Sequence, residues 1–279
     1  MRPSTVNHLL PKNALSRLGS AFFYASLLLV LLAWPAVDSL AKQADTRAVR
    51  VAEVIDGDTV RLKSGETVRL IGINTPELGR DGRPDQPMAQ KARVRLVQLL
   101  RGKTKYLRVG KEPRDRHGRL LGYLIVDGKP VQIALIEEGL GWAIAIPPNI
   151  AFLDELRHAE TRARHANRGV WAVKTYQPKP VSELGRDDYG FQFIRGTLSG
   201  TWSGRNAHLF SIDEDDAKKR ARFVFLVQDK NWPLFGGEPQ SLVGLQVEAR
   251  GWISRHPRFG LRMVTPHPFM LGLESKPTN

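Results

Sequence analysis

Three short segments of the sequence carry oxygen-bearing side chains whose spacing suits chemistry on a phosphate group. Asp56 and Asp58 flank a glycine directly before a β-branched run, and a Thr-Pro-Glu turn at 75–77 follows a second such run. The segment 114–119 adds Asp115 between arginines. Carboxylate, amide and carbonyl oxygens are hard ligands that suit calcium or magnesium. These residues therefore indicate a candidate site for a divalent cation beside a phosphate.

Two arginines accompany these oxygens. Arg69 lies in the apolar run before the turn, and Arg119 ends the third segment. A guanidinium binds a phosphate through two parallel hydrogen bonds and stabilises the charge of a phosphoryl transition state. Adjacent side chains of a strand point to opposite faces, so Arg69 can face a site while Val68 and Leu70 pack in a core. Each segment alone is also typical of an ordinary turn or a solvated loop, and only their joint order and spacing favour a functional site.

In this order the three segments resemble the signature of the staphylococcal nuclease-like (thermonuclease) family, and the similarity continues to the segment Asn167–Trp171. It spans residues 49–171 of the 279-residue chain. The resemblance implies that Glu77 is the general base that activates water. It also implies that Arg69 and Arg119 bind the scissile phosphate and stabilise its transition state.

The resemblance further implies a calcium site formed by Asp58, Asn74 and the backbone carbonyl of Thr75, with Asp56 and Asp115 in supporting roles. Asn74 stands where the family's best-known member has a second aspartate. An amide oxygen still coordinates a hard cation, but the site loses one negative charge, and ligand charge tunes cation affinity. We therefore expect weaker calcium binding than at an all-aspartate site, or use of another divalent cation.

The expected substrate pocket departs further from the family. The two tyrosines that contact the terminal phosphate and base of the substrate correspond to Ala145 and Pro147, and His117 replaces another tyrosine. Stacking on a nucleic-acid base is then weaker or supplied by another residue. His117 and Trp142 are the candidates for contact with nucleic acid in this domain, and Trp142 equally fits a position in the core.

The net charge and the absence of cysteine limit the classes of partner and site that the protein can have. The chain has 42 Lys and Arg against 28 Asp and Glu, a net charge of +14 and a pI near 10.3. Such an excess attracts polyanions, of which DNA and RNA are the commonest, and it would also attract anionic membranes or cell-wall polymers. The absence of cysteine excludes disulfides, a disulfide-linked partner, thiol catalysis and cysteine-based zinc sites. The histidines show no zinc-ligand spacing.

The N-terminus is typical of a targeting signal. Arg2, Lys12 and Arg17 precede an uncharged stretch from Leu18 to Val37, and small residues follow at 39 and 41. This pattern predicts a signal peptide over residues 1–41, or alternatively a retained membrane anchor. In both cases the domains that follow are exported, either to the periplasm or medium, or to the outer side of the cytoplasmic membrane.

Apolar spacing predicts a mixed β/α fold for residues 47–173, an OB-like five-stranded barrel with helices after the third and fifth strands. The strands are expected at 49–55, 58–63, 67–73, 104–109 and 120–126. The expected helices are one opened by Pro87 with the stripe Ala89, Ala92, Leu96 and Leu99, one at 131–138, and one with the stripe Phe152, Leu156, Ala159 and Ala163.

A Pro-containing linker at 174–189 leads to a second mainly-β domain at 190–273, which weakly resembles OB-fold nucleic-acid-binding modules. Its strands are expected at 193–198, 207–212, 222–227, 245–253 and 261–265. Stacking and backbone contacts with nucleic acid would come from four residues, although the aromatic ones equally fit the barrel core. These residues are Trp202, Arg205, Phe259 and Arg262.

The sequence thus predicts an exported, calcium-dependent nuclease that hydrolyses phosphodiester bonds of DNA, RNA or both with a base-activated water. The resemblance implies an endonuclease, but the residues leave open whether cutting starts inside the chain or at its ends. One alternative is a non-catalytic nucleic-acid-binding protein on a nuclease-like scaffold, which Asn74 favours and the retention of Asp58, Arg69, Glu77 and Arg119 opposes. Another is an envelope protein that holds acidic polymers, which explains the charge but not the site. The preference between DNA and RNA and the oligomeric state stay open.

Overall fold

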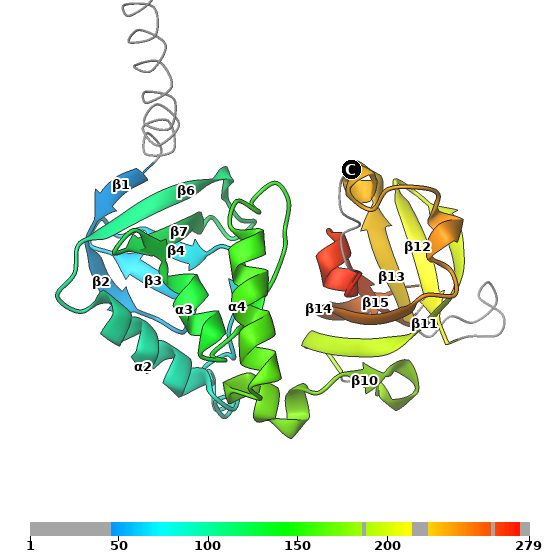
Figure 1. The fold of residues 1–279 in the computed structure, drawn as a ribbon, viewed down its shortest axis with the longest axis horizontal. Helices are drawn as coiled ribbons and strands as arrows, with labels where there is room; N and C mark the ends of the chain where they lie inside the picture. Colours follow the sequence, from blue (N-terminus) through cyan, green and yellow to red (C-terminus); the bar gives the residue numbers. More distant parts are fainter. Residues whose placement is uncertain (1–45, 186–187, 214–222, 258–259, 274–279) are drawn as a thin grey trace, which may run out of the picture. The chain divides into compact units, whose positions relative to one another are not determined.

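The computed structural model describes residues 46–185, 188–213, 223–257 and 260–273 (Figure 1). The expected signal peptide or anchor at 1–41 and the candidate residue Phe259 lie outside the described residues. Within the described ranges, no helix is both long and apolar enough to cross a membrane. The chain from Arg47 onward clusters into one unit.

Alternation of apolar and polar residues builds the first sheet. In the strand 59–62, Val60 and Leu62 are buried, whereas Arg61 between them is exposed. Val68 and Leu70 are buried in the same way in the next strand. The strands are β1 (Thr46–Val49), β2 (Val51–Val54), β3 (Thr59–Leu62), β4 (Thr67–Leu70), β6 (Lys105–Arg114), β7 (Leu120–Val126) and β8 (Lys129–Pro130).

Their order is β1-β6-β7-β4-β3-β2, with β8 on the edge of β7. Strands β4 and β7 run parallel, and the pairs β2–β3, β3–β4 and β6–β7 run antiparallel. Strands β1 and β2 stand at the two ends of this order, but only Arg50 separates them in the sequence. The series of strands therefore closes into a ring, because β1 continues directly into β2. A separate two-stranded sheet joins β5 (Ile73–Asn74) to β9 (Trp142–Ala143).

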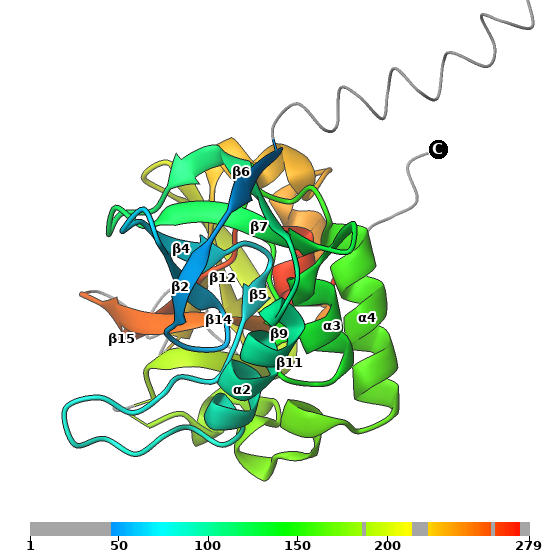
Figure 2. The same cartoon turned by 90° about the vertical axis from the view of Figure 1, so that its left-hand side faces the viewer.

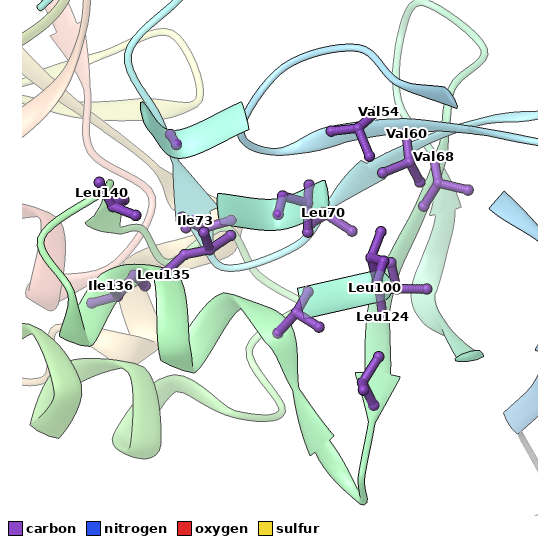
Figure 3. Packing of buried hydrophobic residues seen from close by; sticks show 14 of the residues in the cluster. Val54, Val60, Val68, Leu70, Ile73, Leu100, Leu124, Leu135, Ile136 and Leu140 are labelled. Carbon is purple, nitrogen blue, oxygen red and sulfur yellow. The ribbon is translucent and has the colours of Figure 1, made fainter. Parts of the chain in front are cut away.

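Three helices pack beside this sheet. They are α2 (Ala89–Leu100), α3 (Val131–Glu137) and α4 (Leu153–His165), and α3 contacts both of the others (Figures 1 and 2). Side chains from the strands and from α2 and α3 meet in one apolar core (Figure 3). The mixed β/α architecture predicted from the sequence is confirmed.

The second sheet contains β10 (Lys179–Pro180), β11 (Gly190–Gly204), β12 (Ala207–Ile212), β13 (Phe223–Gln228), β14 (Gln246–His256) and β15 (Gly260–Val264). Strand β11 pairs with both β12 and β14, and the neighbours run β11-β12-β13-β15-β14 and back to β11. Short 3-10 helices complete the described chain, namely η1 (Gly169–Ala172), η2 (Lys174–Tyr176), η3 (Val181–Glu183), η4 (Asp229–Leu234), η5 (Pro239–Leu242) and η6 (Pro268–Leu271).

Several element bounds differ from the sequence-based expectation: the expected strand 49–55 divides into β1 and β2, and β6 extends beyond 104–109. Three further differences have a local explanation. The expected strand 67–73 divides into β4 and β5 because the chain turns at Gly72, whose φ is 80°. Pro87 does not open α2, which begins at Ala89 after Met88 adopts a left-handed φ of 74°. Strand β11 extends well beyond 193–198, because its two ends pair with different neighbours.

A buried ion pair connects the second sheet to the helices and strands of the first. Glu160 of α4 and Arg250 of β14 are each 5% exposed, and an Arg250 Nη1 proton is donated to Glu160 Oε2. The other carboxylate oxygen of Glu160 accepts the backbone N–H of Ala143 (2.8 Å), and Arg250 also donates to the Ala143 carbonyl (3.2 Å). Because Ala143 belongs to β9, the pair also fixes the strand that holds β5.

Removal of this arginine is expected to destabilise the protein strongly. Arg250→Ala leaves the Glu160 carboxylate buried without its countercharge, which costs about 3–5 kcal/mol of the free energy of unfolding. Chemical denaturation measures the loss. Arg164→Ala is the matched control, because its ion pair with Glu248 is partly exposed and such pairs contribute at most about 1 kcal/mol. Equal losses in the two variants would contradict this role of the buried pair.

Candidate active site

The loop between β2 and β3 holds two buried carboxylates. Asp56 and Asp58 are 6% and 3% exposed. The backbone N–H of Asp58 donates to Asp56 Oδ1 (3.1 Å), and Asp58 Oδ2 accepts the backbone N–H of Thr75 (2.9 Å). Between them, a Cβ on Gly57 would lie 2.7 Å from Thr75 Oγ1. The close approach of the two loops therefore requires glycine at this position.

Arg69 of β4 is fixed by several acceptors at once. Its Nη1 donates to the carbonyls of Leu70 (2.6 Å) and Ile73 (2.8 Å). Its Nη2 donates to Asn74 Oδ1 (3.2 Å) and lies 3.0 Å from Asp58 Oδ2. With a side chain only 13% exposed, the guanidinium is held in one orientation beside the buried carboxylates.

Asn74 and Thr75 follow directly on this arrangement. Asn74 belongs to β5 and pairs with Trp142 of β9, while Thr75 begins the turn that leads to Glu77. Both Asn74 and Thr75 are almost fully buried, at 5% and 2% exposed. The β5–β9 pairing therefore sets the position of the Asn74 amide relative to Arg69 and Asp58.

Glu77 stands at the rim of the site. Its backbone N–H donates to Gln86 Oε1 (2.8 Å), and its carbonyl accepts the backbone N–H of Gln86 (3.0 Å). Although the residue reaches solvent, the surrounding chain partly encloses its carboxyl. This burial raises the pKa of Glu77, and the charges of Asp58 and Asp56 raise it further against the opposing effect of Arg69.

Asp56 is the most strongly perturbed carboxyl of the site. Burial and the nearby charge of Asp58 raise the pKa of Asp56 to about 6, although the hydrogen bond from the Asp58 backbone and the charge of Arg69 oppose the shift. Burial is the larger cause of this shift and the charge of Asp58 the second, and a nearby cation would lower the pKa of Asp56 again.

Arg119 is positioned by Asp115 across the turn between β6 and β7. Asp115 Oδ2 accepts from Arg119 Nε (2.7 Å), and Asp115 Oδ1 accepts the backbone N–H groups of His117 (2.9 Å) and Arg119 (3.0 Å). Burial opposes ionisation of Asp115, but these hydrogen bonds outweigh it and lower the pKa of Asp115. The carboxylate therefore stays charged and holds the guanidinium.

Two pockets meet at this site. The first, about 460 Å³, is lined by Arg69, Leu70, Ile71, Gly72, Asn74, Glu77, Glu112, Arg114, Asp115, Arg116, His117, Arg119, Leu121, Ile144, Ile146, Asn149 and Trp252. The second, about 370 Å³, is lined by Asp56, Asp58, Thr59, Glu77, Leu78, Gly79, Arg80, Arg83, Pro84, Gln86 and Arg119. Glu77 and Arg119 line both, so they stand between the smaller pocket, which contains Asp56 and Asp58, and the larger one, in which arginines outnumber acidic residues.

The structure brings most of the predicted site residues together around the two pockets or in direct contact with their walls. Trp142 is different, because it is 3% exposed and packs against Tyr176 and Phe191. Its ring is part of the core and is not available for stacking on nucleic acid. Trp202, Arg205 and Arg262 line neither pocket.

Sequence reasoning missed several residues of these walls. Arg80 and Arg83 line the smaller pocket, and Arg114, Arg116 and Trp252 line the larger one. The density of arginine in the segments 80–83 and 114–119 was a signal for four of them. No local pattern marks Trp252, which lies on β14, far along the chain from the motif.

The fold and pockets define a barrel with packed helices that presents carboxylates and arginines at one surface site. A family model described as staphylococcal nuclease homologue matches residues 67–173. The thermonuclease of Staphylococcus intermedius is 34% identical over 124 residues, which cover 43% of this chain and 74% of that protein. The chain belongs to the staphylococcal nuclease family.

Two endonucleases of Bacillus subtilis are also similar. The SPbeta prophage-derived endonuclease YokF is 33% identical over 133 residues, or 46% of this chain and 45% of that protein. Endonuclease YncB is 34% identical over 133 residues, or 46% of this chain and 63% of that protein. The similarity thus spans less than two thirds of either endonuclease.

The raised pKa of Asp56 predicts pH-dependent stability in a chelator. Asp56 titrates near 3.8 in the unfolded chain and near 6 in the folded one, so the folded state binds more protons between these values. The free energy of unfolding should therefore fall as the pH rises from about 4 to about 6, and the raised pKa of Glu77 acts in the same direction. Thermal denaturation in EDTA, followed by circular dichroism, measures this slope.

Asp56→Asn is the matched variant, because its amide stays neutral across the same pH range. It should flatten the fall in thermal stability between pH 4 and pH 6. A slope as steep as that of the unaltered protein would assign the pH dependence to other groups.

Proposed function

We propose that this protein is a nuclease that hydrolyses phosphodiester bonds of DNA, RNA or both, with water as the nucleophile. The observation that carries the proposal is the placement of Glu77 and Arg119 in the walls of both pockets, beside the Arg69–Asp58 ion pair. A proton acceptor and two phosphate-binding cations thus surround one position. Similarity to endonucleases and a thermonuclease supports the same reaction.

Glu77 is the general base in this proposal. Its carboxylate accepts a proton from the attacking water as the new bond to phosphorus forms. A base is most effective when its pKa lies near the working pH, and the enclosure of Glu77 raises its pKa in that direction. The two hydrogen bonds between the Glu77 backbone and Gln86 hold the carboxylate at the rim.

Arg69 and Arg119 bind the phosphate and stabilise the charge that develops on its oxygens. Both guanidiniums are held in advance, Arg69 by backbone carbonyls and Asp58, and Arg119 by Asp115. Donors fixed before the reaction need no reorganisation in the transition state. In the described contacts, Arg119 donates to Asp115 through Nε. Its two terminal nitrogens can therefore donate to a phosphate.

The oxygen donors around Asp58 fit a hard divalent cation, and we propose calcium. Asp58 and Asn74 would hold it through side-chain oxygens and Thr75 through its carbonyl, with Asp56 in support. The raised pKa of Asp56 fits a site built for positive charge. Among the described residues, no three His, Cys, Asp or Glu side chains form a metal cluster by themselves, so amide and carbonyl donors are needed. When bound, the cation supplies Lewis-acid polarisation of a phosphate oxygen.

The second sheet is proposed to be an OB-like barrel that contacts nucleic acid. Its closed ring of pairings and the net charge of +14 support this assignment. We also propose export of the protein, on the basis of the basic N-terminus, the uncharged stretch from Leu18 to Val37 and the small residues that follow. The N-terminal residue of protein recovered from cells distinguishes cleavage after Ala41 from a retained anchor.

Substitution of the proposed base tests the reaction. With single-stranded DNA and RNA in calcium, Glu77→Gln should lower kcat by about 10²- to 10⁴-fold, and Arg119→Ala by about 10²- to 10³-fold. Arg95→Ala is the control, because it removes the same charge from a helix-surface ion pair with Glu138 and should leave kcat unchanged. Binding without cleavage in calcium, magnesium and manganese would instead favour a nucleic-acid-binding scaffold.

Asn74→Asp should tighten calcium binding several-fold, because it restores a negative charge among the proposed ligands. Isothermal titration calorimetry measures the dissociation constants. Asn206→Asp, in the turn between β11 and β12, adds the same charge away from both pockets and should leave calcium affinity unchanged. Tighter binding by the unaltered protein than by Asn74→Asp would overturn the proposed ligand role of Asn74.

A further inference from the structure

Trp252 joins the second sheet to the larger pocket. It lies on β14, yet it lines the same pocket as Arg69, Glu77 and Arg119. The residue is 41% exposed, and Ile146, 46% exposed, lines the pocket as well. Exposed large apolar side chains that gather at one concave site commonly mark a binding surface.

The Trp252 ring packs against Phe191, which is half-buried and itself contacts buried aromatic residues. Trp252 pairs with Phe191 between β14 and β11, and their ring centroids lie 5.1 Å apart at an interplanar angle of 67°. Phe191 in turn packs against Trp142 (5.4 Å) and Phe193 (5.7 Å). The ring is therefore supported by the core and needs little ordering when a ligand binds.

The lining of this pocket has two chemical sides. Four arginines stand against three acidic residues, and a wall of aliphatic side chains and Trp252 completes the surface. A nucleotide has the same two sides, a charged phosphate and an apolar base face. The volume of about 460 Å³ falls within the range of small-ligand pockets.

Few other rings are available for a base in this pocket. Trp142 is buried and does not line this pocket. Among the described residues that line the pocket, His117 and Trp252 carry the only rings. His117 lies within the turn that presents Arg119, whereas Trp252 is the larger and more apolar surface.

We propose that Trp252 stacks on a base of the nucleic-acid substrate, so that the second sheet supplies part of the substrate-binding site. This inference rests on the proposed nuclease function for the identity of the ligand. It assigns to β14 the role of positioning the strand while Arg69, Glu77 and Arg119 act on the phosphate. Stacking is tolerant of sequence because every base has a π face.

The test compares Trp252→Ala and Trp252→Phe on two oligodeoxynucleotides of equal length. One carries bases, and the other carries tetrahydrofuran abasic residues. Trp252→Ala should raise KM for the base-containing strand by about 5- to 100-fold with little change in kcat, and Trp252→Phe should restore most of the loss. On the abasic strand, Trp252→Ala and the unaltered protein should have similar KM values. Equal effects of Trp252→Ala on both strands would overturn the proposal.

Leu245→Ala is the matched control, because Leu245 is also 41% exposed beside β14 but does not line the pocket. It should leave both KM values unchanged. A binding assay separates this proposal from the nuclease proposal. In Glu77→Gln with EDTA, the base-containing strand should quench tryptophan fluorescence, and the quench should be lost in Glu77→Gln/Trp252→Phe. This result without cleavage by the unaltered protein would refute the nuclease and retain the stacking role, whereas cleavage with no Trp252-dependent quench would refute stacking.

Discussion

The buried ion pair between Glu160 and Arg250 is the interaction on which the arrangement of the site depends. One carboxylate joins α4 to the backbone of β9 and to an arginine of β14. Strand β9 pairs with β5, and Asn74 is a residue of β5. The larger pocket includes Trp252, two residues after Arg250 on the same strand. This ion pair therefore helps to set the positions of Asn74 and Trp252 relative to each other.

The site combines groups that oppose one another. Asp56, Asp58 and Glu77 crowd negative charge into a partly enclosed space, and the raised pKa values of Asp56 and Glu77 express the energetic cost. Arg69 offsets part of it through Asp58 and is itself immobilised by backbone carbonyls. Strongly perturbed pKa values of this kind commonly cluster at functional sites. In the proposed function, a bound cation would offset this cost and the arginines would bind the phosphate.

The sequence predicted the mixed β/α architecture of the first part of the chain, and its local motifs lie together around the two pockets. The bounds of β7 and β12 match the expected strands, since alternating apolar residues end at clear turns. Trp142 and Trp252 show the limit of this approach. Both are tryptophans in apolar strand segments, and only tertiary packing buries the first and exposes the second. A residue that reaches a site from another sheet leaves no spacing signal near the motif.

The closed rings of strand pairing have a consequence for how molecules of this protein meet one another. An open sheet presents unpaired backbone groups that can recruit a strand from a neighbouring chain. In the second sheet, the first half of β11 pairs with β14 and its second half with β12, which closes the series of pairings. In the first sheet, the continuity of β1 with β2 closes it through the chain. Strand-mediated aggregation is thus disfavoured by topology, in a chain that has no cysteines to crosslink it.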